Sequence, residues 1–128
     1  MPAPTYSRRR ALQWLLALLP VAVSRAAPAA DRIVRLRIVE RRVQEDSRIV
    51  RVNAGDRVEL RWTSDEATTI HLHGYDIALA LVPGVEAPMR FAADATGRYP
   101  ISAHGFGSAG ERASHREVVL VYLEVLPR

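Results

Sequence analysis

Cysteine is absent from this chain of 128 residues, and so is lysine. Without cysteine there can be no disulfide, no thiolate metal ligand and no thiol nucleophile. Long apolar stretches are also missing, because the most apolar one covers only residues 11–23. That is short of the roughly 20 residues that a permanent membrane-spanning helix needs. The length and the lack of disulfides together indicate one modest domain with a single hydrophobic core.

The excess of positive charge lies in one part of the chain. The formal net charge is +4, and Arg8, Arg9, Arg10 and Arg25 account for it, because no acidic residue occurs before Asp31. From there to the end of the chain, arginines and acidic residues balance. A neutral domain has no general attraction for phosphate groups, so a nucleic-acid partner is not expected.

The first thirty residues have the three-part plan of a cleavable export signal. A basic cluster, Arg8–Arg10, comes first, the apolar run 11–23 follows, and the small-residue stretch 26–30 closes the segment. This plan predicts export to the periplasm and no transmembrane segment in the mature chain. An uncleaved amphipathic or anchoring helix is the alternative interpretation.

Small residues mark the expected cleavage site. Ala27 and Ala29 fit the small-x-small rule for such sites, so we expect cleavage after Ala29 or Ala30. The chain is then divided into a signal peptide, residues 1–29, and one domain, residues 30–128.

The basic cluster also resembles a twin-arginine export signal, which directs folded proteins across a membrane. The residues that carry this likeness are Ser7-Arg8-Arg9-Arg10-Ala11-Leu12, with Ala11 where that motif usually has Phe. Three consecutive arginines also suit an ordinary basic leader. Both export routes lead to the periplasm.

The rest of the chain has the pattern of short β-strands. Val58, Leu60 and Trp62 alternate with charged residues, and the segments 33–38 and 50–52 do the same. This period of two predicts half-buried antiparallel strands. Turn residues separate further strand candidates at 68–73, 75–82, 86–92, 98–104 and 117–126. The pattern predicts an all-β, Greek-key β-sandwich of seven or eight strands in a single domain.

The order of these elements resembles the cupredoxins over nearly all of the domain. The residues that carry the likeness are Val52-Asn53-Ala54-Gly55-Asp56-Arg57-Val58, a Trp-bearing strand, a His-containing segment, Val82-Pro83-Gly84, Met89 to Asp94, Ala95 to Tyr99 and Leu123-Glu124-Val125. The resemblance implies a copper site at one end of the sandwich. It also implies a Cys ligand near Ala103, where this chain has none, so a blue-copper electron carrier is excluded.

With no cysteine present, histidine is the remaining candidate for the metal ligands. All four histidines, His71, His73, His104 and His115, fall where the resemblance implies a copper end. On a strand, His71 and His73 project to the same face. The segment His71-Leu72-His73-Gly74 also resembles the HxHG motif of multicopper oxidases, which need several such motifs. A single motif favours one metal site over a multicopper cluster.

The chemistry of the four histidines predicts the metal. Neutral imidazoles without sulfur suit Cu(II) or Zn(II), and export favours copper, with zinc possible. Met89 suits the core better than the site. Asp76 can orient a histidine or cap a turn. Each histidine taken alone also suits a purely structural position.

Two functions are therefore open. The first is a periplasmic copper carrier, buffer or chaperone with a histidine-only site, and the second is a metal-free interaction module for a membrane oxidase or transporter. A periplasmic or membrane protein partner fits either function. Ser102, Ser108 and Ser114 lie near histidines but form no nucleophile-elbow or triad pattern, so hydrolysis is not expected. Redox catalysis would need acidic partners that the sequence does not place.

Overall fold

The computed structural model describes residue 1, residues 28–107 and residues 116–128. Most of the predicted leader and His115 lie outside these residues. The strands within them are β1 (Asp31–Ile38), β2 (Ile49–Asn53), β3 (Arg57–Ser64), β4 (Thr68–Leu72), β5 (Ile77–Leu81), β6 (Ala87–Ala92), β7 (Gly97–His104) and β8 (Val118–Leu126). Each of them corresponds to a predicted strand, and most of their ends differ from the predicted ends by no more than about two residues.

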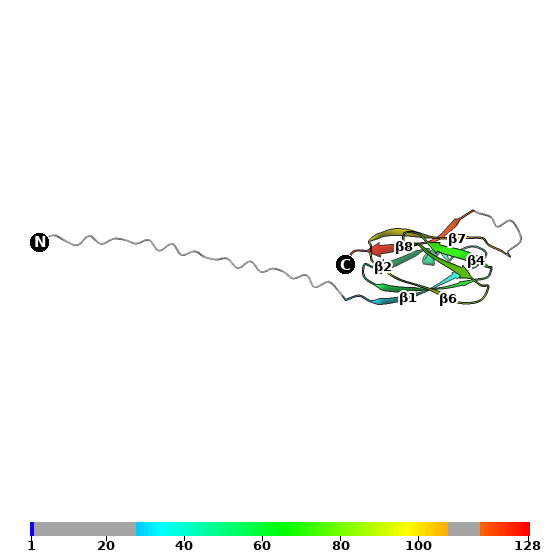
Figure 1. Cartoon of the computed structure of the whole chain (residues 1–128), viewed down its shortest axis with the longest axis horizontal. Helices are drawn as coiled ribbons and strands as arrows, with labels where there is room; N and C mark the ends of the chain where they lie inside the picture. Colours follow the sequence, from blue (N-terminus) through cyan, green and yellow to red (C-terminus); the bar gives the residue numbers. More distant parts are fainter. Residues whose placement is uncertain (2–27, 108–115) are drawn as a thin grey trace.

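The strands form two sheets packed face to face (Figure 1). The smaller sheet has the order β1-β3-β6, and the larger has the order β2-β8-β7-β4-β5. The start of β1 and the C-terminus lie at one end of the sandwich, and β7 ends and β8 begins at the other (Figure 1). The predicted all-β sandwich is confirmed.

The expectation of antiparallel pairing is wrong for two strand pairs. β1 is parallel to β3, with Asp31 opposite Arg57, and β2 is parallel to β8, with Ile49 opposite Tyr122. Alternation of polar and apolar residues shows that one face of a strand is buried, but it carries no information on direction. Between β1 and β3 in the sequence lies β2, which belongs to the other sheet. No hairpin therefore joins β1 to β3, and nothing forces these two strands to be antiparallel.

The core lies between the inward faces of the two sheets. The smaller sheet contributes Trp62 and Leu60, and the larger contributes Ile70, Leu72 and Ile101, all with no exposed surface. Burial of each such side chain stabilises the fold by about 1.5–3 kcal/mol.

The turn between β2 and β3 contains a buried carboxylate. The Asp56 side chain is fully buried, and it accepts hydrogen bonds from the Asn53 N–H (2.9 Å), the Ala30 N–H (3.1 Å) and the Arg128 guanidinium. Arg32 Nε lies 3.6 Å from Asp56 Oδ2. These partners, the Asn53 N–H foremost, hold the pKa of Asp56 below its usual range. The carboxylate ties together the start of β1, this turn and the C-terminus.

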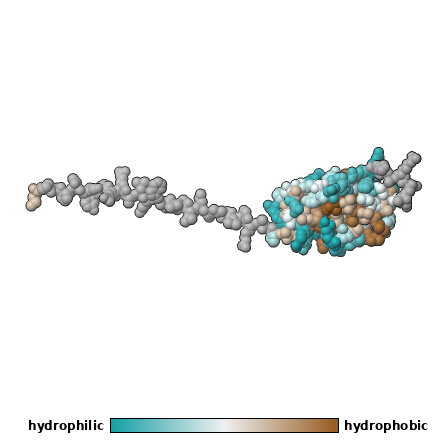
Figure 2. Space-filling view, viewed as in Figure 1, coloured by the Kyte–Doolittle hydropathy of each residue, from teal (hydrophilic) through white to brown (hydrophobic). Residues whose placement is uncertain are grey.

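The surface is unevenly polar. Apolar side chains gather at the end of the sandwich opposite the termini (Figure 2), where β1 ends at Ile38 and β5 ends at Leu81. Val39, Val82 and Val85 are exposed there. Within the described part of the chain the one helical element is the 3-10 turn η1 (Glu45–Ser47), and no helix could cross a membrane.

Candidate metal centre

The two neighbouring histidines lie on the outward face of the larger sheet. Ile70 and Leu72 of β4 point into the core with no exposed surface, so His71 between them and His73 after them point the other way. Their ring centroids are 4.4 Å apart. The prediction that these two imidazoles share a face is confirmed, and they meet on the sheet rather than within the loops at its end.

Strand pairing brings a serine to the same place. β4 pairs with β7, and His71 lies directly opposite Ser102. The Ser102 side chain is 1% exposed, and its Oγ lies 2.7 Å from His73 Nε2. A hydroxyl so placed fixes the orientation of the His73 ring.

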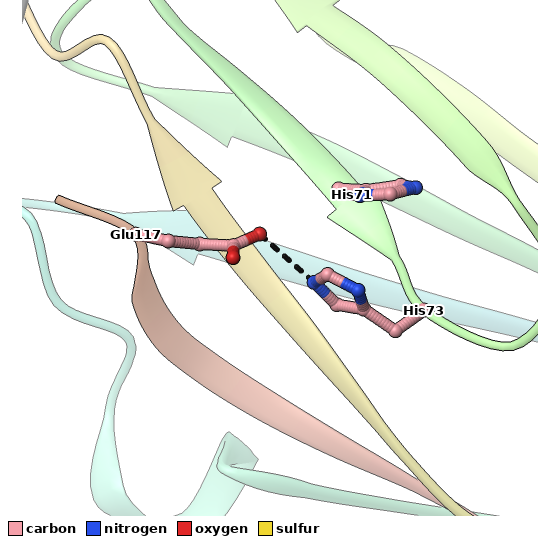
Figure 3. A group of neighbouring side chains, drawn as sticks. All are labelled: His71, His73 and Glu117. Carbon is pink, nitrogen blue, oxygen red and sulfur yellow. Dashed lines mark hydrogen bonds and ion pairs between the residues drawn. The ribbon is translucent and has the colours of Figure 1, made fainter. Parts of the chain in front are cut away.

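Glu117, just before β8, completes the group (Figure 3). Its Oε1 lies 2.8 Å from His73 Nε2, and it accepts a short hydrogen bond from Ser102 Oγ. One potential ligand atom from each of His71, His73 and Glu117 lies within 4.8 Å of the others. All three side chains are partly exposed, so an ion from solvent can reach them.

The carboxyl group of Glu117 favours its charged form. The hydrogen bond from Ser102 is the main cause that lowers its pKa, and the hydrogen bond and charge of His73 add to the effect. Partial burial opposes the shift without cancelling it. An ionised carboxylate beside two imidazoles is a set of ligands that a divalent cation can use.

The turn after His73 is fixed by a glycine. Gly74 has a φ of +86°, and a Cβ on it would lie 2.6 Å from Cδ1 of Tyr99. Any other residue would therefore meet both backbone strain and the aromatic ring. The His73 N–H donates to the Pro100 carbonyl at 3.1 Å, which holds the backbone of His73 against β7.

Asp76 faces the other histidine. Its Oδ1 lies 3.5 Å from His71 Nε2, while its side chain is fully exposed and its φ is +54°. Asp76 therefore lies beside a histidine, as one of its two expected roles requires.

The remaining sequence candidates lie elsewhere. His104 is exposed at the end of β7, opposite Thr69, and is not part of the group around His71. His115 lies outside the described residues. Met89 is 2% exposed on β6, in the core as predicted.

The sequence left Glu117 among the acidic residues that it could not place. Its position depends on how β8 pairs with β7, where the register shifts between Ile101 and Ser102. One signal could have indicated its position. Glu117 comes just before β8, and β8 is antiparallel to β7, so the start of β8 lies beside the end of β7 at His104. The group is consequently mixed, two imidazoles and a carboxylate, whereas the sequence predicted imidazoles alone.

The arrangement of Ser102, His73 and Glu117 is not that of a hydrolytic triad. In such a triad the carboxylate and the serine bind different nitrogens of the histidine. Here both contact Nε2 of His73, and Ser102 donates directly to Glu117. The buried serine therefore positions the acid and the imidazole.

No model of a known protein family matches the sequence, and no curated protein does. Several solved structures are similar in fold. A chain of a heme-copper terminal oxidase dimer has a TM-score of 0.51 and 20% identity over 74% of this chain and 64% of its own. A copper binding protein solved in the apo form has a TM-score of 0.52 and 8% identity over 79% of this chain and 92% of its own.

A multi-copper oxidase from Pseudomonas Thermotolerans is also similar, with a TM-score of 0.56 and 21% identity over 79% of this chain and 31% of its own. The present chain thus spans less than two thirds of the two oxidase chains. These neighbours have cupredoxin folds, and the chain itself has the cupredoxin fold without the blue-copper cysteine.

Proposed function

We propose that the protein is an exported, periplasmic copper-binding protein that holds an exchangeable ion at His71, His73 and Glu117. The observation that carries this proposal is the convergence of these three side chains on the outward face of the larger sheet. The neighbouring folds include proteins described as copper binding, which supports copper as the metal.

The ligand set favours an exchangeable site. Two imidazoles and one carboxylate suit Cu(II), and they also accept Zn(II). The ligands are 30–44% exposed at the side chain, so an incoming chelator or partner protein can reach the ion. Such a site suits a carrier, buffer or chaperone.

His104 and His115 remain proposed as further ligands. The register of β4 and β7 puts His104 on the same outward face as His71 and Ser102. His115 follows in the connection to β8, which begins beside Glu117. A ligand from this connection would add a third imidazole to the two on the sheet.

Titration of the purified protein with Cu(II), Cu(I) and Zn(II) tests the proposal, with the Cu(II) electron paramagnetic spectrum recorded in parallel. We expect one-to-one, submicromolar Cu(II) binding with nitrogen hyperfine structure and full release to a stronger chelator. Binding only at millimolar metal would contradict the proposal. It would favour instead the metal-free interaction module, for which the exposed apolar end at Val39, Val82 and Val85 is the surface to test.

A further inference from the structure

The backbone nitrogen of Ala30, at the start of the domain, lies against a buried carboxylate. It donates to Oδ1 of Asp56 at 3.1 Å, and that carboxylate is fully buried. The Ala30 carbonyl accepts a hydrogen bond from the Arg57 N–H at 3.0 Å. Ala30 is therefore anchored at both backbone groups, one residue before β1 begins.

The sequence independently predicts cleavage on one side or the other of this residue. Ala27 and Ala29 satisfy the small-x-small rule for hydrolysis of the bond between Ala29 and Ala30. Cleavage one residue later would put Pro28 at the first of the two small positions. It would also remove the residue that bonds to both Asp56 and Arg57.

We propose that the leader is removed between Ala29 and Ala30 and that the new α-ammonium group of Ala30 forms an ion pair with the buried carboxylate of Asp56. Water adds across the peptide bond under a signal peptidase. The carboxylate product stays on Ala29, and the amine on Ala30 takes up a proton. The nitrogen that donates one hydrogen bond before cleavage then carries three N–H donors and a positive charge.

The surroundings of Asp56 fit a cationic partner. Two arginines, Arg128 and Arg32, already approach the carboxylate, which shows that the fold directs positive charge toward it. Arg128 also donates to the carbonyl of Pro28, a bond that is lost when the leader departs. Cleavage also turns the amide N–H of Ala30 that donates to Asp56 into an ammonium donor, so that hydrogen bond then joins two charged groups.

The proposal rests on the exported leader and is independent of the metal site. Expression of the full chain in a bacterium, followed by N-terminal sequencing and intact mass of the exported product, gives the first test. We expect a single N-terminus at Ala30. An N-terminus at Asp31 or at any earlier position would overturn the cleavage position, and an uncleaved chain would overturn the export signal as well. Metal affinity measured on the same sample separates these failures from failure of the proposed function.

The second test measures the reactivity of the new amine. Because the chain has no lysine, the α-amine is the only primary amine in the processed protein, and a succinimidyl acetate labels it alone. Ala30 is exposed, so burial does not block the reagent. An ion pair raises the pKa of an amine, and a rise of one unit slows labelling near neutral pH about tenfold. We therefore expect the α-amine to be labelled about tenfold more slowly in the folded protein than in the chain unfolded in urea.

Two variants control this measurement. Asp56→Asn should bring labelling of the folded protein to the rate of the unfolded chain. A chain that begins at Ala29 places its ammonium one residue away from Asp56, and it should label as fast as the unfolded chain even if Asp56→Asn does not fold. Equal labelling rates for the folded and unfolded wild-type protein would overturn the ion pair.

Discussion

Two carboxylates at different places in the sandwich have opposite kinds of surroundings. Asp56 is fully buried, and fixed backbone N–H groups of Asn53 and Ala30 bind it. Glu117 is 44% exposed, and the side chains of Ser102 and His73 bind it. Both carboxyl groups have a lowered pKa, for different reasons.

The comparison separates a carboxylate that holds the fold together from one that is available for a ligand. A metal ion cannot replace backbone donors without unfolding the turn, so Asp56 is committed to structure. Side-chain donors can rotate away, so Glu117 can exchange its hydrogen bonds for an ion. Four variants test this division.

The largest expected effect on binding comes from replacing both His71 and His73 with Ala. Copper affinity should fall more than about a hundredfold, beyond the loss that follows removal of an outer hydrogen-bonding partner. The fold should persist, because His71 on β4 and His73 just after this strand both point away from the core. Isothermal titration and urea unfolding of the same variant check both parts. Retained tight binding would disprove the proposed site.

Asp56→Asn should lower the stability of the fold and leave copper binding unchanged. We expect a lower urea midpoint and the same copper affinity as wild type. The variant loses a charge that Arg128 and backbone N–H groups stabilise. Because the folded pKa of Asp56 is lowered, its contribution to stability is present above its unfolded pKa of about 3.9 and is lost as pH falls through the folded pKa. The difference between wild type and variant should therefore shrink below about pH 4. An equal difference at pH 7 and pH 2 would contradict this.

Glu117→Gln should weaken copper binding by about ten- to a hundredfold with little effect on the urea midpoint. The amide keeps the shape of the carboxylate and removes its charge. Glu45→Gln is the matched control, since Glu45 is almost fully exposed and pairs only with its neighbour Arg48 among the contacts described. If both variants bind equally well, Glu117 is not a ligand.

Ser102→Ala should have the smallest effect on binding, about tenfold, at the lower end of the range for loss of an outer hydrogen-bonding partner. The serine hydroxyl orients His73 and is the main cause of the lowered pKa of Glu117. Without it, the carboxylate should protonate at a higher pH, and copper affinity should begin to fall at a higher pH than in wild type. Ser47→Ala, at a partly exposed serine of η1 that lies outside the group around His71, serves as the control. Identical pH profiles for the two variants would argue against a positioning role.

The sequence pattern predicted the strands and the shared face of His71 and His73, because period two assigns residues to faces without reference to partners. It did not predict which strands pair, and parallel pairing of β1 with β3 was missed. Glu117 could not be placed for the same reason, since its approach to His73 depends on the shifted register of β7 and β8. Asp56 was recognised only as a turn residue, because its buried partners come from both ends of the domain.

The register of β4 has a consequence for how the protein can be monitored. A slip of one residue against β7 would move His71 and His73 into the core and bring Ile70 and Leu72 to the surface. The same register of β4 therefore buries Ile70 and Leu72 in the core and presents His71 and His73 on the outward face. If copper binds at this group, copper binding by a newly folded chain would report that β4 and β7 have paired in the native register.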